Sequence, residues 1–133
     1  MQDSFWSLQE SSLSPACIVV PTSAENVSTA ISILCSGSQG HHYPFAIKGG
    51  GHSPNAGFAN IENGVTIDMS SMDSISYDPG TSVASVGAGA RWFSVYWYLS
   101  DYGMAVAGGD NGAVGVGGLL IGGMIKTLEI DHI

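Results

Sequence analysis

The first half of the chain alternates between strand-like and helix-like patterns of apolar and polar positions. A short β-branched run at residues 17–20 ends at Pro21 and predicts a strand. Apolar residues then recur at the spacing of one helical face, at Val27, Ala30, Ile31 and Leu34. Residues 43–48 predict a second strand. A strand, a helix and a strand within about thirty residues predict a βαβ unit, whose ligands favour the carboxyl ends of the strands.

The predicted helix carries start and stop signals. The sequence Thr22-Ser23-Ala24-Glu25 matches a capping box, in which Thr22 is the N-cap and Glu25 reaches back to it. Gly37 and Gly40 then end the helix, because glycine favours the backbone conformation found just after a helix.

The second half of the chain is richer in predicted strands. Residues 65–69 and 83–86 predict strands, each preceded by a turn signal, Asn63-Gly64 and Asp78-Pro79-Gly80. Residues 91–101 predict a helix with one apolar face, made of Trp92, Val95, Tyr96 and Leu99. Residues 104–107 predict a buried strand. The fold class is therefore α+β, with a βαβ lobe followed by a more strand-rich lobe.

Glycine is the outlier of the composition. The chain has 19 glycines in 133 residues, about twice the usual level of about 7%. They cluster at residues 49–51, 87–89 and 108–123 and show no collagen-like period. Such clusters are typical of loops that bind a ligand closely, because no Cβ separates the backbone N–H groups from an anion.

The charge of the chain excludes one class of partner. It has 11 acidic and 3 basic residues, for a net charge of −8, so it lacks the basic stripe that nucleic acid binding requires. A bound pyrophosphate would be held mainly by backbone N–H groups and helix N-termini. The glycine clusters suit that role.

Several other patterns favour ordinary structural roles. Residues 105–125 are long enough to span a membrane, but Asp110, Asn111 and the glycines argue against a span. The adjacent His41 and His42 lack carboxylate partners, so no metal site is expected. Three carboxylates flank turns and favour turn roles, Asp68, Asp73 and Asp78.

The cysteines and the first residues bear on localisation. Cys17 and Cys35 fit no metal spacing, and the sequence leaves open whether they form a disulfide or are two buried thiols. The first residues show no signal peptide, because they lack a basic start and an apolar run.

One segment points to a particular chemistry. In residues 45–54 a strand-like run leads into three glycines and then His52. This segment resembles the flavin-attachment segment of FAD-linked oxidases of the vanillyl-alcohol-oxidase and p-cresol-methylhydroxylase (PCMH) type, more narrowly the berberine-bridge-enzyme-like group. Residues 86–92 and 115–120 resemble further segments of that family. The resemblance covers residues 5–123, and the sequence departs from the family pattern after Gly123.

The resemblance implies a PCMH-type FAD-binding domain over residues 13–133, incomplete at its C-terminal end, with residues 1–12 as an N-terminal extension. It implies that His52 is bonded covalently to the 8α-methyl group of the flavin. A neutral imidazole can form such a bond, because it is a nucleophile at neutral pH. The implied cofactor-binding residues are Lys48, Gly49, Gly50, Gly51, His52, Ser53, Gly57, Gly109, Val114, Gly115, Gly117, Gly118 and Gly122.

The same resemblance implies a function for the full-length protein, of which this chain would be an N-terminal fragment. Relatives oxidise alcohols, sugars or similar small molecules by hydride transfer to a covalently bound flavin, with oxygen as the electron acceptor, and most are secreted. The family's catalytic residues lie beyond this stretch, so no catalytic residue is expected here. The alternative is a flavin-binding remnant or interaction module without turnover. A nucleic acid or membrane partner is not expected.

Overall fold

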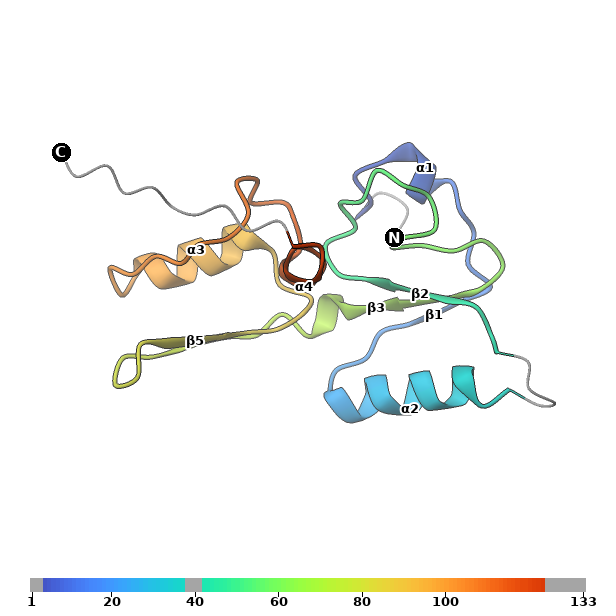
Figure 1. Cartoon of the computed structure of the whole chain (residues 1–133), viewed down its shortest axis with the longest axis horizontal. Coiled ribbons are helices and arrows are strands. Elements are labelled where there is room, and N and C mark those ends of the chain that lie inside the picture. The colour runs from blue at the N-terminus through green and yellow to red at the C-terminus, as the bar shows by residue number, and fades with distance from the viewer. Residues whose placement is uncertain (1–3, 38–41, 124–133) are drawn as a thin grey trace.

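Three parallel strands form one half of the molecule, drawn on the right in Figure 1. The computed structural model describes residues 4–37 and 42–123. Strands β1 (Cys17–Val19) and β2 (Phe45–Lys48) both pair with β3 (Val65–Asp68), so the sheet order is β1-β3-β2. The two strands of the predicted βαβ unit are therefore parallel but separated by β3, which enters between them. All three carboxyl ends lie at one edge of the sheet.

Helix α2 (Ala24–Cys35) covers one face of this sheet. The predicted apolar face of the helix is confirmed, because Leu34 is buried against Ile67 and Met69. Val27, Ala30 and Ile31 pack around the same cluster. Complete burial of an aliphatic side chain of this size contributes about 1.5–3 kcal/mol, so the cluster is a main source of stability for this half.

The start of α2 differs by one residue from the prediction. Ser23, not Thr22, is the N-cap, and its side chain accepts a hydrogen bond from the backbone N–H of Asn26. The Oδ1 atom of Asn26 in turn accepts from both the backbone N–H and the hydroxyl of Thr22. Asn26 therefore takes the reciprocal place that the sequence pattern gave to Glu25.

The second half consists of a hairpin and a helix, drawn on the left in Figure 1. Strands β4 (Ile75–Asp78) and β5 (Val83–Val86) are antiparallel, and a short 3-10 helix, η3 (Met69–Ser71), joins them to β3. Helix α3 (Trp92–Ser100) packs on the hairpin through Trp92, Val95 and Leu99. These are residues of the predicted apolar face, which is confirmed.

The turn role predicted for Asp78 is confirmed. Its carboxylate accepts hydrogen bonds from the hydroxyl of Thr81 and the backbone N–H of Gly80, and these bonds lower the pKa of Asp78. The same prediction for Asp68 is incomplete, because its carboxylate is buried and also forms an ion pair, described below.

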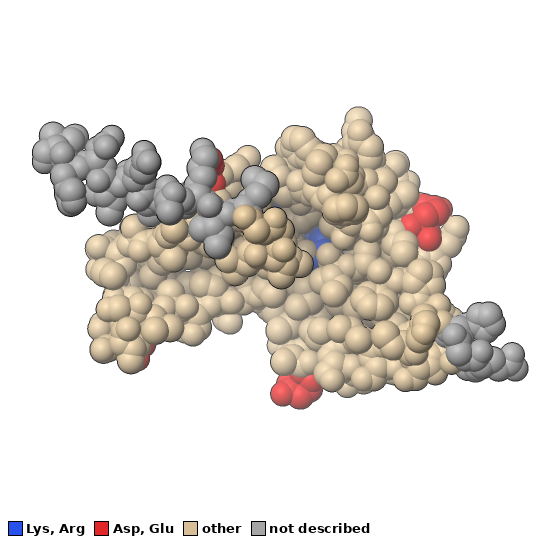
Figure 2. Space-filling view, viewed as in Figure 1, with Lys and Arg blue, Asp and Glu red and all other residues tan. Residues whose placement is uncertain are grey.

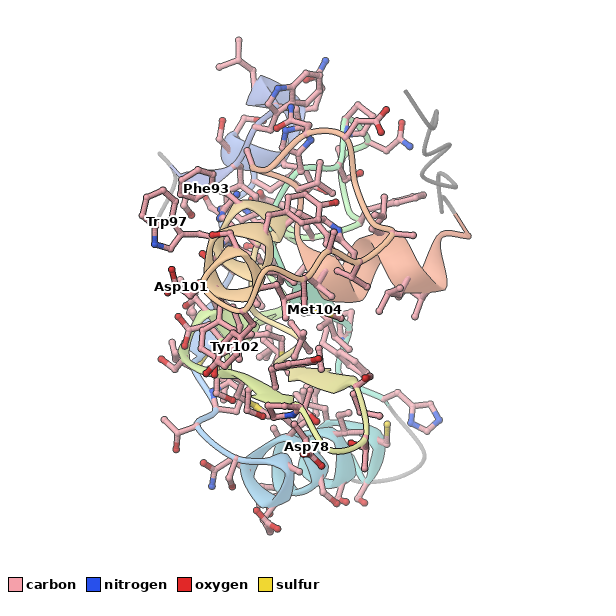
Figure 3. All side chains as sticks on the ribbon, turned by 90° about the vertical axis from the view of Figure 1, so that its left-hand side faces the viewer. Asp78, Phe93, Trp97, Asp101, Tyr102 and Met104 are labelled. Atoms are coloured by element: carbon pink, nitrogen blue, oxygen red, sulfur yellow. The ribbon has the colours of Figure 1, made fainter. Side chains whose placement is uncertain are left out.

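The outer side of α3 is also apolar. Phe93 and Trp97 stack with ring centroids 6.2 Å apart and are 63% and 68% exposed. Figure 3 shows both side chains projecting from α3 away from α4, with Tyr102 and Met104 below them. Helix α3 therefore carries apolar side chains on both its buried and its exposed side. This explains why apolar and polar residues are not clearly separated onto opposite faces in its sequence.

Residues 104–107 do not form the predicted strand. The backbone N–H of Met104 donates to the carbonyl oxygen of Leu99 and so closes the end of α3. Among the described residues the hairpin sheet contains β4 and β5 alone, so no strand edge pairs with this segment. Further along, helix α4 (Val116–Ile121) forms inside the glycine-rich stretch and lies between the two halves in Figure 1.

Residues 5–11 fold onto the glycine-rich side of the sheet. Helix α1 (Leu8–Ser11) carries Glu10, which is completely buried. Its carboxylate accepts three backbone hydrogen bonds, from Phe58, Ala59 and Asn60, at 2.8–2.9 Å. The domain boundary at residue 13 stays a prediction, but residues 5–10 contact the body of the fold directly.

We expect Glu10→Gln to lower the free energy of unfolding by about 1–3 kcal/mol, because an amide nitrogen replaces one oxygen and leaves a buried N–H unpaired. Urea denaturation followed by circular dichroism measures the change. Glu62→Gln is the matched control, since the Glu62 carboxylate is exposed and accepts a single hydrogen bond within the described ranges, from the backbone N–H of Ser14. We expect less than about 0.5 kcal/mol there. Equal losses in both variants would contradict the role given to Glu10.

Candidate cofactor-binding site

A buried ion pair lies where the strands β2 and β3 end. Lys48 and Asp68 are register partners, and Lys48 Nζ lies 3.1 Å from Asp68 Oδ2. Both residues are almost fully buried, and Nζ also lies 5.3 Å from the centre of the Phe5 ring. The pair therefore fixes the carboxyl ends of two strands beneath the loop that begins at Gly49.

Three glycine segments, residues 49–51, 87–89 and 115–118, meet above this edge of the sheet. The backbones of Gly50 and Gly115 touch, and a Cβ placed on either residue would lie 2.7 Å from the Cα of the other. A Cβ on Gly117 would lie 2.9 Å from the carbonyl oxygen of Ala88. Backbone atoms approach this closely only without side chains. The sequence predicted three ligand-binding loops, and the structure brings them to one place.

The last glycine segment is held by a short backbone ladder. The N–H of Trp92 donates to the carbonyl of Val114, and the N–H of Val116 donates to that of Ala90. The guanidinium of Arg91 also donates to the carbonyl of Ala113. This ladder places Val114, which is half-buried, and Gly115 at the start of α4.

The loop that contains Gly109 packs against α3. The hydroxyl of Tyr96 donates to the carbonyl oxygen of Gly109 at 2.8 Å. Burial raises the pKa of Tyr96, and the negative charge of Asp110 adds to the increase, so the phenol stays a donor at neutral pH. Within the described residues, one buried side-chain polar atom lacks a hydrogen-bond partner, Nε1 of Trp92. A buried unpaired donor costs free energy, so it marks a place where a ligand oxygen would be favourable.

His52 follows the first glycine segment and is half-buried. Its ring stacks on the indole of Trp6, with ring centroids 5.1 Å apart and an interplanar angle of 21°. The next residue, Ser53, forms a local turn with Asn55, in which the Ser53 hydroxyl accepts from the backbone N–H of Asn55. The imidazole therefore lies at the rim of the glycine segments.

Gly57 and Gly122, two further predicted cofactor residues, lie outside the three segments. Gly57 has a positive φ of 90° and lies in an exposed loop, and a Cβ there would meet no described atom within 4 Å. Gly122 is the C-cap of α4, and its N–H donates to the carbonyl of Gly118. Their roles in binding stay predictions.

The site leaves room for a ligand beside α4. A Cβ placed on Gly118 would meet open space. Figure 2 shows a hollow at this part of the surface, with the basic atoms visible on this face inside it and acidic atoms only at the edges. Glycine backbone without obstructing Cβ atoms and space beside it fit the diphosphate of a dinucleotide.

Other candidate sites gain no support. The described residues contain no group of three side chains suited to a metal ion. His42 is described and hydrogen-bonds the Cys35 carbonyl through Nδ1, whereas His41 lies outside the described residues. Cys17 and Cys35 are free thiols on the surface, so both readings of them, a disulfide and buried thiols, are wrong for this structure. No helix in the described ranges is long and apolar enough to cross a membrane.

Sequence reasoning missed three residues of this region, Trp6, Glu10 and Asp68. Each acts through a partner distant in the sequence, His52 for Trp6, the loop at 58–60 for Glu10 and Lys48 for Asp68. The sequence offered a signal for Asp68 alone. Two predicted strands carry residues of opposite charge near their carboxyl ends, Lys48 and Asp68, which could form an ion pair if the strands are neighbours.

The chain is similar to several known proteins. The family model described as "FAD binding domain" matches residues 15–130, and so continues past Gly123, where the resemblance was expected to end. An FAD-dependent monooxygenase of Aspergillus calidoustus, drtC, is 45% identical over 91% of this chain and 23% of its own length. A second, tpcD of Cochliobolus heterostrophus, is 42% identical over 96% of this chain and 24% of its own length.

Solved structures show the same fold. Glucooligosaccharide oxidase from Acremonium strictum, described with a 6-S-cysteinyl, 8α-N1-histidyl FAD, superposes with a TM-score of 0.77 at 30% identity, covering 92% of this chain and 25% of that one. For 6-hydroxy-D-nicotine oxidase from Arthrobacter nicotinovorans the TM-score is 0.73 at 28% identity, covering 81% and 23%. The chain thus spans about a quarter of the length of the proteins it matches.

Proposed function

The chain belongs to the FAD binding domain family, and from this premise we propose that it holds FAD where the three glycine segments meet. Its relatives and structural neighbours are FAD-dependent oxidoreductases and monooxygenases. The observation that carries the proposal is the contact between the backbones of Gly50 and Gly115, since it joins two glycine segments beside open space. A dinucleotide diphosphate can be held by backbone N–H groups that no Cβ separates from it, and this chain has few cations to offer instead.

The proposed contacts divide between two parts of the cofactor. Backbone groups of residues 49–51 and Ser53 bind the diphosphate from one side. Val114, Gly115, Gly117 and Gly118 bind the diphosphate and the ribityl chain from the other side. Lys48 contributes by fixing the end of β2 beneath Gly51 through its ion pair with Asp68. Gly57, Gly109 and Gly122 complete the proposed set.

We further propose that His52 carries the flavin covalently. Formation of a bond between an imidazole nitrogen and the 8α carbon would release one proton from each partner and two electrons in total, and dioxygen would take up both protons and both electrons as hydrogen peroxide. The position of His52 at the rim of the glycine segments supports the proposal. A structural neighbour whose flavin is attached to histidine supports it as well.

The reaction of the whole protein is also a proposal, because the chain spans about a quarter of its relatives. When bound, FAD supplies a two-electron acceptor for hydride. We propose a small alcohol or sugar-like molecule as the hydride donor and oxygen as the final acceptor. Neighbours named as oxidases of gluco- and xylooligosaccharides support this class of substrate. Secretion stays a prediction from the family resemblance.

The absorbance spectrum of the purified chain, before and after acid precipitation, tests the flavin proposal. We expect a yellow precipitate from the wild-type chain, because a covalent flavin survives unfolding. His52→Ala should give a colourless precipitate, while a matched control, His42→Ala, should give a yellow one. A yellow precipitate from His52→Ala would contradict attachment at this residue, and a colourless wild-type supernatant and precipitate would contradict FAD binding.

A further inference from the structure

The contact between Trp6 and His52 links the start of the chain to the proposed attachment residue. The two rings are nearly parallel, at 21°, with centroids 5.1 Å apart. Trp6 is nevertheless 63% exposed, so one face of its indole covers the imidazole and most of the remainder faces solvent. A large aromatic side chain that stays exposed while covering one polar ring suggests a role other than core packing.

Trp6 is fixed in place by its own backbone and its neighbours. Its N–H donates to the carbonyl oxygen of Gly51 at 2.9 Å, immediately before the histidine. Phe5 is buried against the Lys48 side chain, and Glu10 ties the following helix to the loop at residues 58–60. The segment is therefore anchored on both sides of Trp6, which limits where the indole can move.

The imidazole of His52 has little else to orient it. Among the described residues no side chain or backbone group forms a hydrogen bond with either ring nitrogen. The residue also follows Gly51, which has a positive φ of 66° and no side chain to restrict its neighbour. Without another contact, rotation about the side-chain bonds would turn the nitrogens through many directions, and an attacking atom must lie within about 3–3.5 Å of its target in a defined orientation.

We propose that Trp6 is a positioning residue that holds the plane of the His52 imidazole for attachment to the flavin. The inference rests on the proposed function, because it assigns Trp6 a role only if His52 is the attachment residue. The indole stacks on one face of the ring and leaves both nitrogens at the ring edge free to react. Trp6 itself takes part in no bond making or breaking.

Two measurements on the full 133-residue chain test this role. The first is the NMR shift of the His52 ring protons without added FAD, which a stacked indole displaces upfield. The second is the rate at which acid-stable flavin appears after FAD is added. We expect Trp6→Ala to remove the upfield displacement and to slow incorporation by about ten- to a hundredfold. Trp6→Phe should retain most of both, since a phenyl ring can still stack.

The controls separate this inference from the proposed function. Trp97→Ala removes another exposed tryptophan, stacked on Phe93, and should leave both readouts unchanged. A wild-type chain that never gains acid-stable flavin overturns the proposed attachment and this inference with it. If the wild-type chain gains flavin and Trp6→Ala gains it at the same rate or faster, the inference alone is overturned. Circular dichroism confirms that each variant is folded.

Discussion

Replacing Lys48 by methionine is expected to lower the free energy of unfolding by about 3–5 kcal/mol, the largest stability effect that we predict for a single substitution. The substitution leaves the Asp68 carboxylate buried without its counter-ion at the edge of the sheet. Removal of a charge from solvent is costly unless an opposite charge compensates it. Chemical denaturation with tryptophan fluorescence or circular dichroism measures the loss.

The double variant Lys48→Met/Asp68→Asn is the control for this prediction. It removes both charges, and replacement of a buried ion pair by uncharged groups is often close to neutral. An asparagine oxygen can still accept the hydrogen bond from the backbone N–H of Ser70 that Asp68 Oδ1 accepts now. Because the amide nitrogen of the asparagine is left unpaired, we expect the double variant to regain part of the lost stability. A double variant as unstable as Lys48→Met would show that the lysine acts by packing and not by charge.

Gly115→Ala is expected to abolish retention of FAD and to destabilise the fold by about 1–3 kcal/mol. The added Cβ would lie 2.7 Å from the Cα of Gly50, so two glycine segments must separate. The backbone conformation of Gly115 is ordinary, with φ −74° and ψ 140°, so the whole effect comes from this contact. Flavin absorbance per chain and the midpoint of urea unfolding measure the two consequences.

Gly118→Ala separates an effect on FAD retention from an effect on the stability of the fold. This residue lies within α4, and a Cβ there would meet open space. Alanine is more favourable than glycine in a helix by about 1 kcal/mol, so the fold should be as stable as the wild type or more so. We expect it to retain less FAD, because the methyl group enters the space assigned to the cofactor. Unchanged retention of FAD in both glycine variants would contradict the proposed site.

The sequence predicted the elements whose signals are local. The apolar faces of α2 and α3 recur at helical spacing, and both helices form where expected. The N-cap of α2 was wrong by one residue because Thr22 and Ser23 are adjacent hydroxyl residues, and the side chain of Asn26 decides between them. A pattern of residue types alone cannot show which hydroxyl that side chain engages.

Features that depend on tertiary partners were less predictable. The apolar pattern of residues 104–107 predicted a strand, but a strand forms only where a neighbouring strand edge can pair with it. In the structure the backbone N–H of Met104 instead donates to the carbonyl oxygen of Leu99 at the end of α3. The glycine clusters identified ligand-binding loops, yet their sequence could not show that Gly50 and Gly115 touch. Neither could it show that Lys48 and Asp68 are register partners, because β3 enters the sheet between β1 and β2.

The mass of the denatured chain is the most direct test of the central claim, that the glycine segments and His52 hold FAD. Trypsin cleaves after Lys48 and Arg91 and so releases residues 49–91, which contain His52. We expect the intact chain to be heavier by one FAD less two hydrogen atoms, and this peptide to carry the additional mass. An unmodified chain, or a flavin on any other peptide, would contradict it.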